Sequence, residues 1–245
     1  DAVVHSHEGF RSSFMAQGDD VVQVVPPLKR HAIHWIERPE ANKERVTAAT
    51  RELMEAEALK TLDLAKESQL RATIASFSPD EHLLMLTMHH IICDGWSNGV
   101  LLRELAENYT RLFQSDAPPP EDLPLQYGDY AVWQKDWLAG AQAAEQLAYW
   151  RQHLGGELPV LNLPTDRPRG PRPTFNGHIH TLLLPQEIAD GLRGVCQREK
   201  VTPFMLHLSA YVLLLHRYSG RSDFVVGSPA ANRNQTELEG LIGLF

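Results

Sequence analysis

The chain has little cysteine: only Cys93 and Cys196 occur among its 245 residues. Two cysteines cannot build a disulfide framework, and their spacing matches no zinc motif, so a reducing, cytoplasmic setting is predicted. The chain also lacks an apolar run as long as a membrane span, and its first residues lack the pattern of a signal peptide. We therefore predict neither a membrane segment nor secretion.

An excess of basic residues is also missing. Lysine and arginine number 23 against 31 acidic residues, which gives a net charge of −8. This balance does not steer the chain toward nucleic acid. The single basic patch, "TDRPRGPRP" at residues 165–173, is short and rich in proline, which is typical of a surface linker.

The remaining sequence alternates between strand and helix patterns. β-Branched and apolar runs predict strands at residues 19–27, 32–37, 70–77, 82–92, 177–185 and 223–231. Helical periodicity and composition predict helices at 42–59, 97–113, 186–200 and 203–218, with a further helix ending near 154. Ser97 is the expected N-cap of the second helix, and strand 82–92 is expected inside a covered sheet. The order indicates a mixed α/β fold of two α/β layers joined at 164–175.

The stretch "HHIICDG" combines two histidines, an acid and a glycine at the end of an apolar run. Neighbouring side chains on a strand point to opposite faces, so His89 and His90 are not expected to hold one metal ion, and no metal site is predicted. His89 is read as a hydrogen-bonded core residue. A neutral His90 imidazole could accept a proton, although the residues alone leave a purely structural role open. Asp94 needs a buried partner, and Gly95 permits close approach of another group.

Cys93 raises a competing idea, a cysteine nucleophile paired with histidine. Its neighbours are apolar, and nothing near it in the sequence would lower its pKa. The residues favour an inert buried thiol.

"HHIICDG" matches the H-H-x-x-x-D-G signature of condensation domains from nonribosomal peptide synthetases. Five further stretches resemble that family in the same order along the chain. They are "SHEGFRSSF" at 6–14, "YGDYAVWQ" at 127–134, "YWRQHLGGELPVLNLPTDRPR" at 149–169, and "LLHRYSGRSDFVVGSPAANRN" together with the terminal "EGLIGLF".

The resemblance implies a chloramphenicol-acetyltransferase-like, two-lobed α/β fold with the signature between the lobes. Residues 1–164 would be the N-terminal lobe, 165–175 the linker and 176–245 the beginning of the C-terminal lobe. Such domains join two thioesters by an amide bond. No cofactor would be bound directly, because each substrate is carried on the phosphopantetheine arm of a partner. The implied partners are an upstream donor carrier domain, a downstream acceptor carrier domain and an adjacent adenylation domain.

The resemblance also implies roles for individual residues. His90 would orient or deprotonate the attacking amine, and His89 would support the site. Asp94 would be structural, held by an arginine for which Arg11 is the candidate. Gly95 would lie where the backbone meets the substrate tunnel.

Trp96 and Ser97 follow the signature and would line the tunnel. Their presence, together with both histidines, indicates the subtype with an L-donor and an L-acceptor. Ser6 stands where the family has an arginine, so a salt bridge from that position is absent.

Two alternatives remain open from the sequence. One is a freestanding acyltransferase of the same fold that uses a soluble acyl thioester, and the other is a non-catalytic carrier-docking module. Because the chain opens on Asp1 and stops at "LEGLIGLF", we expect a piece of a longer protein, truncated at both ends and inactive by itself.

Overall fold

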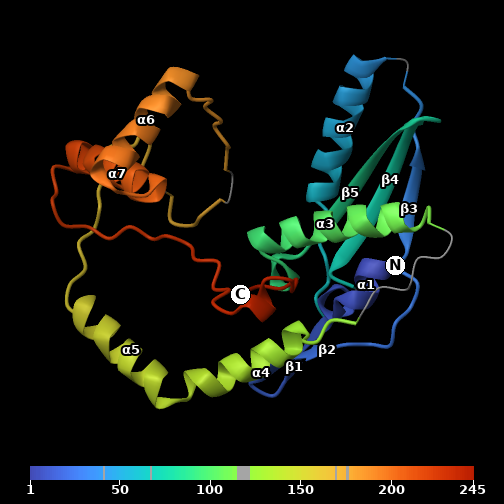
Figure 1. The fold of residues 1–245 in the computed structure, drawn as a ribbon, viewed down its shortest axis with the longest axis horizontal. Coiled ribbons are helices and arrows are strands. Elements are labelled where there is room, and N and C mark those ends of the chain that lie inside the picture. The colour runs from blue at the N-terminus through green and yellow to red at the C-terminus, as the bar shows by residue number, and fades with distance from the viewer. Residues whose placement is uncertain (41, 67, 115–121, 169, 175–176) are drawn as a thin grey trace. The chain divides into compact units, whose positions relative to one another are not determined.

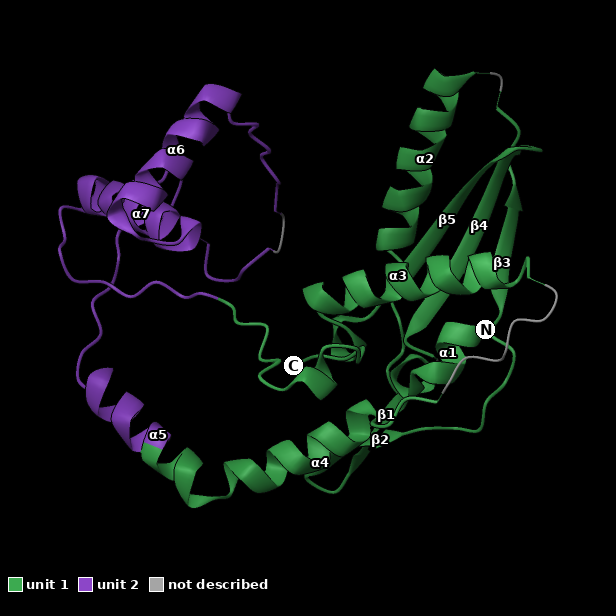
Figure 2. Ribbon diagram, viewed as in Figure 1, with its two compact units in different colours: residues 1–145, 229–245 green, residues 146–228 purple. Residues whose placement is uncertain are grey.

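The computed structural model describes residues 1–40, 42–66, 68–114, 122–168, 170–174 and 177–245 (Figure 1). Packing divides the chain into two compact units (Figure 2). Unit 1 comprises residues 1–145 and 229–245, and unit 2 comprises 146–228. This division differs from the predicted boundary at 165–175, of which residues 169 and 175 lie outside the described part. The predicted division into lobes stays a prediction.

The central element of unit 1 is a three-stranded sheet in the order β3-β4-β5. β3 (Ile33–Glu37) runs parallel to β4 (Leu70–Ser78), and β5 (Glu81–Met88) is antiparallel to β4. Helix α2 (Lys43–Ala58) connects the two parallel strands, as such a pair requires. These four elements follow the predicted ranges within a few residues, since their patterns are long and regular.

The N-terminal segment folds beside this sheet. It consists of α1 (Ala2–Ser6), the 3₁₀ turn η1 (Glu8–Arg11) and a hairpin of β1 (Ser13–Gln17) and β2 (Asp20–Val24). Gly18, with φ of 66°, lies in the hairpin turn, where a positive φ favours glycine.

Two apolar clusters hold these elements together. Packing of α2 on one part of the sheet buries Ala49, Ala75 and Phe77. The larger cluster joins α1, η1, the start of β4, the signature segment and helix α3 (Gly95–Arg111). Its buried members are Val3, Val4, Phe10, Leu70, Ile92, Cys93, Val100, Leu101 and Ile242. The signature segment is therefore anchored on the main core of unit 1.

The prediction that strand 82–92 lies inside a covered sheet is wrong. In the described residues β5 is an edge strand, and it ends at Met88. Its pattern is apolar, yet Leu84 is 45% exposed. An apolar run alone does not distinguish a central strand from an edge strand, because that depends on which neighbours pair with it.

The remaining helices are α4 (Tyr127–Leu138), α5 (Ala141–His153), α6 (Gln186–Glu199) and α7 (Pro203–Ser219). A short 3₁₀ turn, η3 (Thr236–Leu238), follows in the returning segment of unit 1. Helices α6 and α7 confirm the ranges predicted for them, and α5 ends at His153, close to the predicted end near 154. Thr202 and Gly220, for which no capping role was predicted, are the caps of α7. The strands predicted at 177–185 and 223–231 are wrong, because both segments are irregular. A strand pattern forms a strand only when another backbone pairs with it, and neither segment has such a partner in the described residues.

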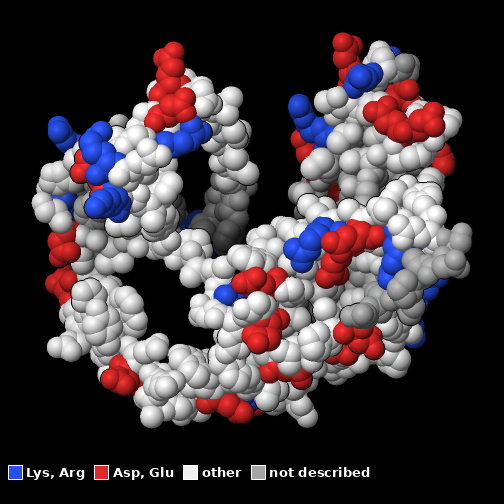
Figure 3. Space-filling model, viewed as in Figure 1, with Lys and Arg blue, Asp and Glu red and all other residues white. Residues whose placement is uncertain are grey.

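Charged side chains of both signs are mixed on the surface (Figure 3). Arg38, for example, pairs with Glu52 at 2.7 Å and with Glu40 at 3.3 Å. No helix of the described residues is long and apolar enough to cross a membrane.

Candidate active site

The first feature of the site is the turn that follows β5. Strand pairing ends where the His89 N–H donates to the Gln69 carbonyl at 3.1 Å. The next residues form the 3₁₀ turn η2 (His90–Ile92), in which the Ile92 N–H donates to the His89 carbonyl at 3.1 Å. The prediction that both histidines lie on the strand is therefore wrong. The backbone closes on itself because the His89 carbonyl and ring accept hydrogen bonds from the turn in place of a neighbouring strand.

The two histidines have different surroundings. His89 is half-buried, and its Nδ1 accepts a hydrogen bond from the Ile91 N–H at 3.1 Å. That contact leaves Nε2 as the protonated nitrogen of a neutral ring. His90 is exposed, and its imidazole has no hydrogen bond to any group in the described part of the chain. Of the two, His90 is the imidazole free to meet a substrate.

Asp94 begins helix α3. Its Oδ1 accepts from the Ser97 N–H at 2.8 Å and from the Ser97 hydroxyl at 2.7 Å. Asp94, and not Ser97 as predicted, is therefore the N-cap, and the helix begins two residues earlier than expected. Both residue types are good caps, and local sequence does not rank them.

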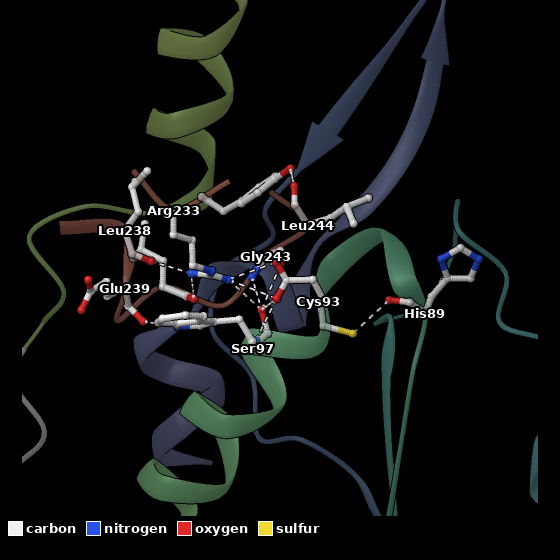
Figure 4. Close-up of polar contacts among 12 residues, drawn as sticks. His89, Cys93, Ser97, Arg233, Leu238, Glu239, Gly243 and Leu244 are labelled. Carbon is white, nitrogen blue, oxygen red and sulfur yellow. Dashed lines mark hydrogen bonds and ion pairs between the residues drawn. The ribbon is translucent and has the colours of Figure 1, made fainter. Parts of the chain in front are cut away.

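The partner of Asp94 is Arg233, from the returning segment of unit 1 (Figure 4). The Nη2 of Arg233 lies 3.2 Å from Oδ1 and 3.3 Å from Oδ2 of the carboxylate. Burial by itself would raise the pKa of Asp94, but the hydrogen bonds from Ser97 and the charge of Arg233 outweigh it and lower that pKa. Asp94 thus stays ionised, and its carboxylate is committed to Ser97 and Arg233. No hydrogen bond joins it to His90 in the described residues, so the pair does not act as in a Ser-His-Asp triad.

Arg11 was predicted as the partner of Asp94, and this prediction is wrong. The Arg11 guanidinium donates to the Pro26 carbonyl at 3.0 Å and pairs with Glu8 at 3.2 Å. These contacts hold η1 against the segment after the hairpin. Arg11 is the arginine that the early motif offers to Asp94, whereas the observed partner, Arg233, lies 139 positions after Asp94.

Arg233 is the centre of a buried polar cluster (Figure 4). Its side chain is 1% exposed. It donates to the Leu238 and Leu241 carbonyls and to the Ser97 hydroxyl at 3.1 Å, and its guanidinium lies 3.9 Å from the centroid of the Phe245 ring. A buried cation surrounded by carbonyls, one carboxylate and an aromatic face is well compensated. The cluster fastens residues 233–245 to the start of α3.

Ser97 belongs to the same cluster. The residue is 1% exposed, and its hydroxyl accepts from the Gly243 N–H at 3.1 Å and lies 2.9 Å from the Gly243 carbonyl. Its single proton is given either to that carbonyl or to Asp94. A role in a tunnel wall stays a prediction, but Ser97 offers no exposed side-chain surface of its own.

Gly95 and Trp96 are the exposed residues at the start of α3. A Cβ placed at Gly95 would meet nothing within 4 Å, so the glycine leaves open space beside the turn and is not required by contacts within this chain. Trp96 is 45% exposed and donates from its indole to the Glu239 carbonyl at 2.9 Å. The predicted tunnel contact of each residue stays a prediction.

Cys93 is 8% exposed, and burial followed by the nearby Asp94 charge raises the pKa of its thiol. The sulfur therefore remains a neutral thiol and is a poor nucleophile. This confirms the inert buried thiol expected from the sequence. No group of three or more His, Cys, Asp or Glu side chains that could hold a metal ion occurs in the described residues.

Sequence reasoning missed Arg233 and Gly243, together with Tyr127, whose hydroxyl donates to the Leu244 carbonyl. All three lie in stretches that resemble the family, so their importance was signalled. The sequence did not indicate that these residues lie close together, because spacing along the chain does not show which distant segments pack against the same helix.

Comparison with known proteins places this geometry in a family. All of residues 1–245 match the family described as "Condensation domain". The chain is 40% identical over 243 residues to one of the proteins that make up linear gramicidin synthase in Brevibacillus parabrevis, covering 99% of this chain and 3% of that protein.

Solved structures agree in fold. The X-domain from teicoplanin biosynthesis superposes with a TM-score of 0.84 at 28% identity, covering 100% of this chain and 54% of that one. A four-domain nonribosomal peptide synthetase, solved with AMP and glycine, shares the fold with a TM-score of 0.81 at 22% identity over 100% of this chain and 18% of its own. The chain therefore belongs to the condensation-domain family of nonribosomal peptide synthetases, whose domains are amide-forming acyltransferases.

Proposed function

We propose that this chain contributes the catalytic histidine to peptide-bond formation between two carrier-bound thioesters. The nitrogen of the acceptor's amine attacks the carbonyl carbon of the donor thioester. The C–N bond forms, the C–S bond breaks, and the proton lost by the nitrogen ends on the departing thiolate. His90 orients the amine or accepts that proton on its way.

The observation that carries the proposal is the contrast between His90 and Asp94. The His90 imidazole is exposed at the tip of a turn whose two ends are anchored, and no described group uses its nitrogens. The Asp94 carboxylate is fully used in binding Ser97 and Arg233. Within the signature, His90 is therefore the side chain available for chemistry, and Asp94 is a charge that holds the structure together.

The partners follow from the same proposal. The donor and acceptor acyl groups arrive on the phosphopantetheine arms of an upstream and a downstream carrier domain, next to an adenylation domain, in the cytoplasm. The support is that this chain spans only 3% and 5% of two synthetase proteins that it resembles, which leaves room for such neighbours. We further propose the subtype with an L-donor and an L-acceptor, because Trp96 and Ser97 follow the signature.

The test is the substitution His90→Ala in the complete synthetase module. Loss of a general base lowers the rate of condensation by about 10²-fold or more. Single-turnover product formation between loaded carriers measures this rate. His34→Ala, which removes an exposed histidine of β3, is the matched control and should leave the rate unchanged.

Three outcomes decide between the functions. Wild-type product from His90→Ala would favour a carrier-docking module without catalysis. Equal activity with a soluble acyl thioester would favour a freestanding acyltransferase. A donor carrying the D-amino acid that reacts as fast as the L-form would contradict the proposed subtype.

A further inference from the structure

The carbonyl of His89 closes the turn that carries His90. It accepts a hydrogen bond from the Ile92 N–H at 3.1 Å. It accepts a second one from the Cys93 thiol, with sulfur and oxygen 3.6 Å apart (Figure 4). The two donors approach from successive residues on the far side of the turn. The position of His90 is therefore set by contacts that its neighbours make.

Cys93 is suited to donate this bond. It is buried in the main core of unit 1, next to Ile92, and burial raises the pKa of its thiol, which favours the protonated form that can donate. A thiol is a weak donor. Here the donor side chain is buried and the hydrogen bond is partly buried, which limits competition from water.

The backbone on the other side of Cys93 is also fixed. Asp94 caps α3 through Ser97 and pairs with Arg233, while Cys93 itself is extended, with φ of −155° and ψ of 156°. Cys93 thus connects a helix start held by several hydrogen bonds to a turn that its own side chain closes. A change at this side chain should therefore affect the turn more than the helix start, because the helix start has more contacts.

We propose that Cys93 is a positioning residue, whose thiol closes the turn His90–Ile92 and thereby holds the His90 imidazole in its reactive orientation. The inference rests on the proposed function of His90. Cys93 touches no substrate and takes no part in bond making.

The competing explanation is that Cys93 only fills space in the core. The two explanations predict opposite results for two substitutions of similar size. Valine keeps the apolar volume but has no donor, whereas serine keeps a donor and buries a polar group. If packing alone matters, Cys93→Val is the better variant. If the hydrogen bond matters, Cys93→Ser is the better one.

The experiment measures single-turnover condensation and melting temperature for both variants in the complete module. We expect Cys93→Ser to keep the wild-type rate within about twofold and Cys93→Val to lose about fivefold, the effect of one modest hydrogen bond. The loss should appear in the rate at saturating acceptor and not in the acceptor concentration needed for half-maximal rate. Cys93→Ser should nevertheless melt at a lower temperature than Cys93→Val, because serine buries a polar group, so that activity and stability rank the variants in opposite order.

The result that overturns the inference is a wild-type rate for Cys93→Val, or rates that follow the melting temperatures. Failure of the proposed function is distinguishable, because full activity of His90→Ala would remove His90 from the reaction whatever Cys93 does. In a His90→Ala background, Cys93→Val should cause no further loss, since positioning then has no imidazole to act on. A further fivefold loss in that background would also overturn the inference.

Discussion

At the scale of single residues, Asp94 and Arg233 form the contact on which the site is built. The side chain of Asp94 is 14% exposed, and that of Arg233 is 1% exposed. Taking two charges out of water is costly, so such a pair contributes little net stability, but removing one partner strands the other. The main role of the pair is therefore to hold together two segments that are distant in the sequence, and its net contribution to stability is small.

We therefore expect Asp94→Ala to destabilise the complete condensation domain by about 3–5 kcal/mol, the usual effect of breaking a buried ion pair. The free energy of unfolding, followed by denaturation at several pH values, measures this. The folded pKa of Asp94 is lowered, so its stabilisation is present above the unfolded value of about 3.9 and is lost as pH falls through the folded pKa. The difference between the variant and the wild type should accordingly shrink in acid.

Asp190 offers a matched control for this prediction. It pairs with Arg193 on the surface of α6, where both side chains are more than half exposed. Loss of a surface pair costs about 1 kcal/mol or less. If Asp94→Ala melts like Asp190→Ala and is nevertheless inactive, the Asp94 carboxylate acts in catalysis and not in structure.

At the scale of secondary structure, the sequence predicts those elements that depend on local pattern. Helices α2, α6 and α7 and strand β4 follow their predictions, because periodicity and capping residues act within a few positions. The strands predicted at 177–185 and 223–231 fail because pairing is not local. The site divides in the same way: the signature identified His90 and Asp94, whereas the Arg233 partner required the fold.

The return of residues 238–245 to helix α4 gives a test of packing at this scale. A methyl group added at Gly243 would overlap the Tyr127 ring, whose hydroxyl also donates to the Leu244 carbonyl. Gly243→Ala should therefore destabilise the domain by about 1–3 kcal/mol through overpacking. Gly240→Ala is the control, because a Cβ there meets nothing within 4 Å.

The melting temperatures of the two glycine variants in the complete domain measure this difference. Because the Gly243 N–H and carbonyl also contact Ser97, a displaced Gly243 should loosen the start of α3 and lower the condensation rate as well. Equal melting temperatures for the two variants would contradict the packing described for Tyr127.

At the scale of the whole molecule, the two units differ in how much apolar surface they bury. The described residues of unit 1 form three clusters of buried apolar side chains. Among the described residues of unit 2, Leu215 is the only buried apolar side chain, while Ile188 of α6 is 50% and Phe204 of α7 60% exposed. Helices α6 and α7 therefore present apolar surface that their own unit does not cover, and exposed patches of this kind favour association.

From this we predict that residues 1–245 alone do not condense carrier-bound substrates at a useful rate. The His90 turn should form, since its supports lie in unit 1. The reaction, however, requires the amine of one tethered substrate to be held next to the thioester of the other. Such positioning supplies much of the rate enhancement in reactions of this kind. The described residues of unit 2 bury only one apolar side chain, which is too small a core to hold substrate-binding residues rigidly. The test gives the isolated chain and the complete domain the same loaded carriers and compares product formation, together with the binding of a dye specific for apolar surface. Strong dye binding without product is expected of the isolated chain, whereas product at a rate close to that of the complete domain would contradict the prediction.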